Sequence, residues 1–371
     1  MPFVCRHKVH GGPQFCVADH PGDAPCGAFE YVRVERLEDL PPADPRIVDV
    51  AVLDMNHGWP NLGHDSLVHA LLDDACDLLP VYDETGLRVR ALSFDVRRAG
   101  MLPELPGDRF KVYVGTGGPG HLDPYANDGV SESSQGIHED PSWLAPASRL
   151  FDAILADDSA SLFAVCHTFG VLCLWSGIAR PVLRGPEKGG KSAGVLENVL
   201  APEAEGHPWF RRFSEELPDG QRLRILDSRL FDLIPGSTSF PSGVTPVGWE
   251  TLGVDGPQGE ALTMVELARD AGGMMPRVFG VNHHPEIVNR ARQLLILEQK
   301  VARGEVSAQW AAERRETMTR TYPDEDSDNL LEVTSNYTLL APLRFHLWRQ
   351  VRLRAEALGL AVDLHEDRVA S

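Results

Sequence analysis

Short apolar runs alternate with amphipathic stretches along the middle of the chain, and this alternation predicts its fold. Residues 47–53 (IVDVAVL) form an apolar run that ends at a polar turn, and a helical pattern follows over residues 66–79. Strands that alternate with helices are typical of a parallel sheet covered on both faces. The other expected strands span residues 89–94, 110–114, 162–165, 222–226, 244–252, 262–267 and 278–281, and the other expected helices span residues 147–156 and 288–304.

The two ends of the chain differ from this middle part in amino-acid composition and in hydrophobic pattern. Residues 1–45 are rich in Pro, Gly, Cys and His and hold a single candidate strand at residues 29–34. Beyond residue 304 the sequence becomes charged and helical, with two helical stretches at residues 308–319 and 343–358 and an acidic break between them. We therefore expect an N-terminal extension (1–45), an α/β domain (46–300) and a C-terminal helical extension (301–371).

Composition and charge narrow the class of protein. The chain has 371 residues, of which 43% are hydrophobic, enough for a well-packed core. No apolar run approaches the roughly 18 residues that would predict a membrane span, and the N-terminus lacks the apolar segment of a secretory signal. We expect a cytoplasmic protein without membrane contact. A net charge of −19 is unfavourable for a nucleic-acid partner, because phosphates are bound by clustered Lys and Arg.

The N-terminal extension carries side chains of the kinds that bind zinc. Their spacing contains no Cys-x-x-Cys pair and matches no structural zinc motif. We therefore predict no metal site here and no cofactor elsewhere in the chain. The side chains concerned are Cys5, His7, His10, Cys16, His20 and Cys26.

Cys166 is the candidate nucleophile, because it stands where an apolar strand stops and a helix-compatible stretch begins. A sharp strand-to-helix turn lifts such a side chain out of the sheet, and the N-terminus of the following helix favours the thiolate. A buried core cysteine is the alternative for any cysteine in an apolar run. We expect that structural role for Cys173, inside the following helix.

The strand at residues 278–281 leads into two histidines, a proline and a glutamate. A residue before proline is pushed toward extended conformations, so His284 should be extended and should share a face with Glu286. A carboxylate that holds one ring nitrogen lets the other nitrogen take a proton from the nucleophile. His283 is expected to line this site or to pack beside it. A His-Pro-Glu segment in a surface loop is the alternative.

A third candidate element is the glycine-rich turn that follows the strand at residues 110–114. Gly117, Gly118 and Gly120 allow the backbone to come close to a substrate and to offer N–H groups to a developing oxyanion. A phosphate cradle or a plain turn are the alternatives. The turn lacks the Lys and Ser/Thr of a phosphate-binding loop.

Together the three segments resemble the class I glutamine amidotransferases. In that family a strand leading to Gly-Gly-Pro-Gly, a cysteine elbow and a strand ending in Gly-Val-Gln-Phe-His-Pro-Glu follow one another in this order. Here the segments read GTGGPG at residues 115–120, AVCHTFG at residues 164–170 and GVNHHPE at residues 280–286. The likeness covers roughly residues 46–300.

The resemblance implies a flavodoxin-like, doubly wound and mostly parallel sheet with the active site at the carboxyl ends of its strands. It implies that Cys166 forms a γ-glutamyl thioester, that His284 is the general acid and base, and that Glu286 orients His284. The backbone N–H groups of Gly118 and His167 would form the oxyanion hole.

The family's activity releases ammonia from glutamine for use by a synthetase. We therefore expect glutamine or a related γ-glutamyl compound as substrate and a synthetase on a separate partner protein. The C-terminal helices are candidates for that contact or for a homodimer.

Three residues near the candidate nucleophile depart from the family pattern. Ala164 and Thr168 stand where the family has glycine, and Gly170 replaces a glutamine that helps to hold the substrate amide. Two other functions therefore stay open, namely a binding or regulatory subunit without glutaminase activity and an acyltransferase or other cysteine hydrolase with the same triad. The long polar segment at residues 121–143 either caps the pocket or is a solvated loop.

Overall fold

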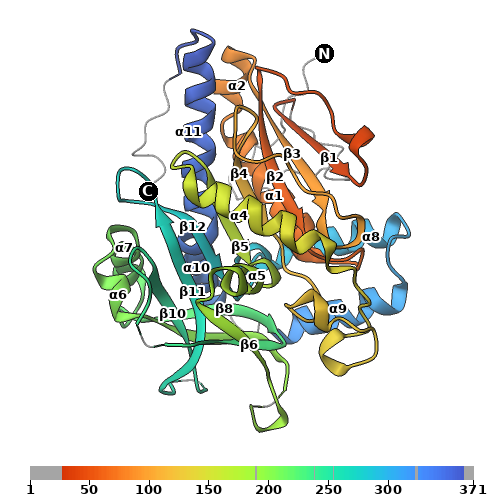
Figure 1. Ribbon diagram of the computed structural model, residues 1–371, viewed down its shortest axis with the longest axis vertical. Coiled ribbons are helices and arrows are strands. Elements are labelled where there is room, and N and C mark those ends of the chain that lie inside the picture. The colour runs from red at the N-terminus through yellow and green to blue at the C-terminus, as the bar shows by residue number, and fades with distance from the viewer. Residues whose placement is uncertain (1–26, 189, 238, 254, 322–324, 363–371) are drawn as a thin grey trace.

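The computed structural model describes residues 27–362 apart from 189, 238, 254 and 322–324, and its centre is a ten-stranded sheet (Figure 1). Six strands run parallel to one another, and four antiparallel strands extend the sheet beyond the sixth. In order across the sheet these strands are β1 (Phe29–Val34), β3 (Arg88–Asp95), β2 (Ile47–Asp54), β4 (Phe110–Gly115), β5 (Ser161–Val165), β12 (Pro276–Val281), β11 (Gln258–Arg269), β10 (Thr245–Thr251), β7 (Ser192–Leu200) and β8 (Arg222–Arg229).

The order of the parallel strands defines the fold class. Numbered along the chain, β2, β3, β4, β5 and β12 lie side by side in the order 2-1-3-4-5, which is the flavodoxin-like arrangement of a doubly wound sheet. The predicted α/β class is therefore confirmed. Because these strands run parallel, their carboxyl ends meet at one edge, where ligands bind in such folds.

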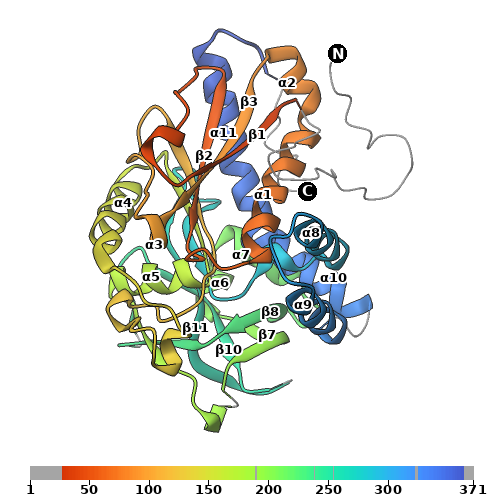
Figure 2. The ribbon, with the colours of Figure 1, turned by 90° about the vertical axis from the view of Figure 1, so that its right-hand side faces the viewer.

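Strand β2 shows why the sheet is covered on both faces. All eight of its residues are buried, and successive side chains point to opposite faces. Val50 and Val52 pack in the cluster that contains α1 (Leu62–Asp77) and α11 (Ala341–Ala357), whereas Leu53 packs in the cluster that contains α4 (Leu144–Ala156) and α5 (His167–Ser176). Figure 2 shows α1 and α4 on opposite sides of β2.

The remaining helices are short or lie near the chain ends. In chain order they are α2 (Leu79–Thr85), α3 (Val96–Ala99), α6 (Pro202–Glu205), α7 (Pro208–Glu216), α8 (Arg290–Ala302), α9 (Ala308–Thr321) and α10 (Glu325–Ser335), with a π-helical turn at Asn336–Leu340 before α11. None of the described helices combines the length and the apolar character needed to cross a membrane.

The start of α1 differs from the prediction. The helix begins at Leu62, although the expected range began at residue 66. Asn61 caps the helix, because its side chain accepts the N–H groups of Gly63 and His64. The first turn is too polar to continue the apolar pattern, so the cap and not the periodicity sets the boundary.

Three strands were not predicted from the sequence. They are β7 and the two strands of a small separate sheet, β6 (Ala179–Leu183) and β9 (Phe231–Pro235). None of the three shows a regular alternation of buried and exposed residues, and Gly194 inside β7 has a φ of +107°. Their pairing partners, rather than a local pattern, make them strands.

The first described strand and the last described helix both belong to or pack onto the central sheet. The expected strand at residues 29–34 is confirmed as β1, the edge strand beside β3. Helix α11 lies against the sheet through Leu343, Leu347 and Val351, and α8, α9 and β8 share a smaller apolar cluster. The division into a domain and two extensions remains a prediction. The candidate zinc residues between Cys5 and Cys26 lie outside the described residues.

Candidate active site

Cys166 lies on a sharp turn between β5 and α5, at the carboxyl edge of the parallel strands. Its φ of +46° and ψ of −96° place it in a backbone conformation that residues other than glycine rarely adopt. Two backbone hydrogen bonds hold the turn, because the N–H of Cys166 donates to Val281 O at 2.8 Å and its carbonyl accepts from Gly170 N at 2.9 Å. Strain of this kind is kept where the surroundings enforce it, most often at functional sites.

The strand neighbouring β5 delivers the candidate base. His284 follows β12, and its Nδ1 lies 2.8 Å from Oε1 of Glu286. Its ring also contacts the sulfur of Cys166. Burial by itself lowers the pKa of His284, but the Glu286 carboxylate and then the Cys166 sulfur raise this pKa well above its ordinary value. The structure thus brings a thiol, an imidazole and a carboxylate together in that order.

The backbone around His284 differs from the expected extended segment. Pro285–Ile287 form a turn of 3-10 helix, and His284 is its N-cap with φ −113° and ψ 78°. The shared face of an extended chain was therefore the wrong reason for the contact. The tight turn after Pro285 folds Glu286 back toward His284, and proline is well suited to start such a turn.

The carboxylate of Glu286 rests against the start of α1. A Cβ atom on Gly63, in the first turn of that helix, would lie 2.6 Å from Oε1 of Glu286. A helix N-terminus carries partial positive charge, which stabilises a nearby carboxylate. Glycine at this position therefore lets the carboxylate approach the helix end.

Glycines also make room in the turn after β4. A Cβ atom on Gly117 would lie 2.7 Å from Cε1 of His284, and a Cβ atom on Gly118 would lie 2.1 Å from the carbonyl oxygen of Met55. Gly120 has a φ of +84°, and its N–H donates to Oε1 of Gln135 at 2.8 Å. The N–H of Gly120 is thus already used inside the protein.

A buried ion pair fixes this glycine turn. The guanidinium of Arg97 donates to both oxygens of Glu139, at 2.6 and 2.7 Å. Nη1 of Arg97 also donates to the carbonyls of Met55, at 2.9 Å, and Pro119, at 2.6 Å. The segment at residues 121–143, which contains Glu139, is therefore packed against the turn.

Thr168 and Gly170, which depart from the family pattern, each pack closely against a neighbouring residue. Thr168 is fully buried, its Oγ1 donates to Thr116 O at 2.7 Å, and its methyl group occupies the space left by the missing side chain of Gly115. The side chain of Leu122 lies 2.4 Å from where a Cβ of Gly170 would stand. An apolar side chain therefore occupies the space beside Gly170.

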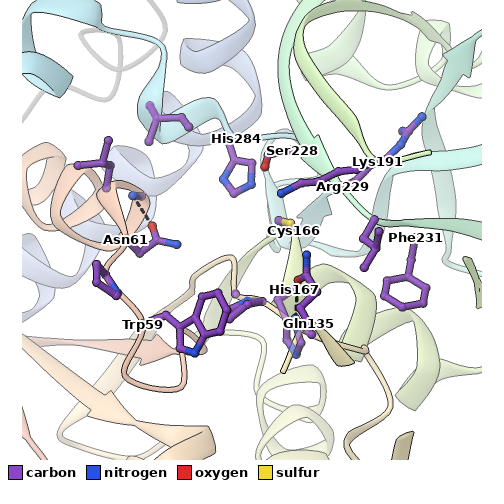
Figure 3. A pocket seen from close by; sticks show the side chains of 18 of the residues that line it. Trp59, Asn61, Gln135, Cys166, His167, Lys191, Ser228, Arg229, Phe231 and His284 are labelled. Atoms are coloured by element: carbon purple, nitrogen blue, oxygen red, sulfur yellow. Dashed lines mark hydrogen bonds between the residues drawn. The ribbon is translucent and has the colours of Figure 1, made fainter. Parts of the chain in front are cut away.

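A pocket of about 230 Å³ opens over Cys166. Figure 3 shows Cys166 in its middle, with Trp59 and Asn61 on one side and Arg229 and Phe231 on the other. Among the residues predicted for the site, Gly118, Gly120, Cys166, His167 and His284 line this pocket.

The other predicted residues lie behind the lining. Gly117 abuts Cε1 of the His284 ring, and Glu286 contacts the neighbouring Nδ1. His283 is buried with its Nε2 3.4 Å from Oγ1 of Thr338, and burial lowers its pKa to about 3. Burial followed by the charge of Arg97 holds the pKa of His167 well below its ordinary value, so its ring is neutral.

Several lining residues could not be found from the sequence motifs. Trp59 and Asn61 come from the turn after β2, which the rule for carboxyl ends of parallel strands could have indicated. Lys191 directly precedes β7, Arg229 ends β8, and Arg314 comes from α9. No motif marks these last three, because long-range packing brings them to the pocket.

Comparisons with known proteins give structural likenesses only. No family model matches the chain, and no curated protein matches its sequence. The protein SMU.1228c aligns over 80% of this chain and 98% of its own, with 14% identity and a TM-score of 0.42. A Thermoplasma acidophilum protein, assigned as one component of a GMP synthase, aligns over 72% and 96%, with 13% identity and a TM-score of 0.36. Likenesses this distant support no conclusion about activity or substrate.

Proposed function

We propose that the chain is a cysteine hydrolase of the glutamine amidotransferase type. The observation that carries the proposal is the buried His284, which contacts the Cys166 sulfur and the Glu286 carboxylate at the floor of the pocket. Cys166 is the nucleophile, His284 the general base and then acid, and Glu286 the group that orients His284. The order of the three sequence motifs supports the same assignment.

The reaction has two steps. His284 takes the thiol proton, and the sulfur of Cys166 attacks the amide carbon, so that a C–S bond forms. The developing oxyanion faces the backbone N–H groups of Gly118 and His167. The C–N bond then breaks, and the leaving amine takes the proton from His284. In the second step water, deprotonated by His284, attacks the thioester and releases the acid and the thiol.

Glutamine or a related γ-glutamyl compound is the proposed substrate. With glutamine the products of the two steps are glutamate and ammonia. The ammonia would pass to a synthetase on a partner protein, as in the family that the sequence motifs resemble. The C-terminal helices α9 and α11, which match the two expected helical stretches, are the proposed surface for that contact or for a homodimer.

An acyltransferase with the same triad is the second candidate. It is favoured by Leu122, which fills the space beside Gly170 where the amidotransferases carry a glutamine that holds the substrate amide. In that case an acceptor alcohol or amine, rather than water, would attack the thioester. The chemistry at Cys166, His284 and Glu286 would be unchanged.

Incubation with a panel of γ-glutamyl amides and acyl donors tests the proposal. Intact-mass analysis should show an acyl adduct that peptide mapping places on Cys166, and the Cys166→Ala variant should show none. An adduct from glutamine supports the glutaminase, and an adduct from other acyl donors alone supports the acyltransferase. No adduct from any donor would contradict both and favour a binding subunit.

A further inference from the structure

The pocket over Cys166 is positively charged, although the protein as a whole is strongly acidic. Lys191, Arg229 and Arg314 line it. Within the part of the chain that the structure describes, no Asp or Glu belongs to the lining. The net charge of the whole chain is −19, so this local excess of cations is opposite to the background. A cleft lined by one sign of charge attracts ligands of the other sign.

Three carboxylates hold the guanidinium of Arg229, and this residue is only 5% exposed. Its Nη2 donates to Oε2 of Glu250 at 2.7 Å, and its Nε lies 3.3 Å from Asp232 and 3.4 Å from Asp227. These carboxylates offset its charge and fix its orientation. Lys191 and Arg314 are exposed side chains and supply the remaining positive charge.

Buried donors at the pocket also lack acceptors. Nη1 of Arg229 and Nδ2 of Asn282 have no hydrogen-bond partner among the described residues, and both residues line the pocket. A buried N–H group without an acceptor costs roughly 1 to 3 kcal/mol. A ligand carboxylate offers acceptors only and would satisfy such donors, whereas an ammonium group would add donors.

We propose that this pocket prefers small acyl compounds that carry a carboxylate and no ammonium group, so that it accepts such a compound more readily than glutamine itself. The proposal deepens the proposed cysteine chemistry and rests on it for the reacting bond. Glutaramate, which is glutamine without its amino group, has the favoured pattern of charge. Glutamine keeps the carboxylate but brings an ammonium group for which the described lining has no acidic partner. Pentanamide, with no charge, lacks the group that the cations would bind.

Alkylation of Cys166 tests the charge preference without requiring any turnover. Iodoacetate and iodoacetamide are similar in size, and both form a C–S bond with loss of iodide, while the thiol proton goes to solvent. The measured quantity is the rate with iodoacetate divided by the rate with iodoacetamide, followed on the Cys166 peptide. The same cysteine in urea-unfolded chain gives the reference ratio. We expect the native ratio to exceed the reference by roughly tenfold at low ionic strength, as a nearby unit charge would produce.

Charge-removing variants identify the source of the preference. Lys191→Gln and Arg314→Gln should each lower the native ratio, because each removes a positive charge from the pocket. Both side chains are exposed, so their replacement leaves the core intact. Arg229→Gln should lower it further, but it leaves three buried carboxylates short of a partner and can unfold the protein. Arg211→Gln is the matched control, since Arg211 is an exposed arginine of α7 outside the pocket lining.

The outcomes separate this proposal from the proposed function. A native ratio equal to the reference overturns the charge preference, as does a Cys166 that reacts with neither reagent. A raised ratio that falls in Lys191→Gln and Arg314→Gln but not in Arg211→Gln supports it, even if no acyl donor leaves an adduct. Acyl adducts that form as readily from pentanamide as from glutaramate would overturn the preference while leaving the cysteine chemistry in place.

Discussion

Three glycines stand where a side chain would collide with a neighbouring side chain of the site. Gly117 faces the ring of His284, Gly63 faces the carboxylate of Glu286, and Gly115 faces the methyl group of Thr168. The geometry of the triad therefore depends on missing side chains as well as on the groups that react.

Gly117→Ala should displace His284 with little effect on the fold. The new Cβ would lie 2.7 Å from Cε1 of the ring and 3.4 Å from Cβ of Cys166. A misplacement of about 1 Å can cost roughly 10²-fold in rate, so alkylation of Cys166 by iodoacetamide at neutral pH should slow by about that factor. Gly236→Ala is the control, because nothing lies within 4 Å of the place that its Cβ would take. An unchanged rate in Gly117→Ala would show that the ring does not depend on this space.

Glu286→Gln should lower the pKa of His284. The carboxylate is the main group that raises this pKa against the opposing effect of burial, and the neutral amide cannot replace its charge. A raised pKa in the folded state stabilises the fold below the ordinary pKa of histidine, and this contribution is lost as the pH rises through the folded value. The stability lost in the variant should therefore be larger near pH 6 than at alkaline pH.

Imidazole titration by NMR measures the pKa change, and urea unfolding at the two pH values measures the stability. The exposed Glu298→Gln is the control and should leave both unchanged. A His284 pKa that does not fall in Glu286→Gln would contradict the role of the carboxylate.

At the scale of elements, the connection from β4 to α4 is a packed part of the site. Three short turns of 3-10 helix interrupt it. Glu139 in this connection accepts hydrogen bonds from Arg97, from Nδ2 of Asn127 at 2.7 Å and from Nε1 of Trp143 at 2.9 Å. The connection thus holds the glycine turn through Arg97.

Glu139→Gln should destabilise the protein strongly. The side chains of Arg97 and Glu139 are both fully buried, so the substitution leaves a buried guanidinium without its counter-charge. Breaking such a pair costs roughly 3 to 5 kcal/mol of unfolding free energy, which urea unfolding would measure. Glu215→Gln, in the exposed pair with Arg211, should change it by less than about 0.5 kcal/mol. Equal effects of the two substitutions would contradict a structural role for the buried pair.

Asp74 links α1 to α11 and should make the stability depend on pH. Burial raises its pKa to about 6, although Arg344 and Trp348 donate to it at 2.8 and 2.9 Å and oppose the rise. Because the folded pKa lies above the unfolded one, protonation favours the folded state. Unfolding free energy should rise, by up to about 3 kcal/mol, as the pH falls from above 6 toward 4.

Asp74→Asn should remove this part of the pH dependence. Urea unfolding at pH 7.5 and pH 5 compares the variant with the wild type. A wild-type protein that gained no stability relative to the variant on acidification would exclude the raised pKa.

At the scale of the whole molecule, α11 closes one face of the parallel sheet although it is the last described helix. Leu347 and Val351 are fully buried in the same apolar cluster as β2 and α1. Residues near the two ends of the described part of the chain therefore belong to one core.

Leu347→Ala should lower the unfolding free energy by roughly 2 to 5 kcal/mol, because it leaves a cavity in this core. Leu353→Ala, in the same helix but 42% exposed, should have little effect. Tryptophan fluorescence and the rate of Cys166 alkylation should both change in a single transition with the same midpoint. Separate midpoints would show that α11 and the site unfold independently.

The sequence by itself determined the parallel sheet and the three segments that meet at Cys166. Apolar runs such as residues 47–53 identify buried strands because both faces of a parallel sheet are covered. The candidate nucleophile and base follow strand ends, so their proximity follows from the direction of the strands. Of the four antiparallel strands, β8, β10 and β11 were also predicted, whereas β7 and the two strands of the small separate sheet, β6 and β9, carry no regular pattern and escaped prediction.

Only the tertiary structure decided how the pocket is walled and charged. Lys191, Arg229 and Arg314 are distant in sequence from Cys166 and come from segments with no motif of their own. Thr168 stands where the family has glycine, and it fits because Gly115 lies opposite it. Local periodicity reports which face of an element is buried, but it does not report which side chains meet across elements. The order of the proposed catalytic residues was therefore readable from the sequence, whereas the charge of the pocket was not.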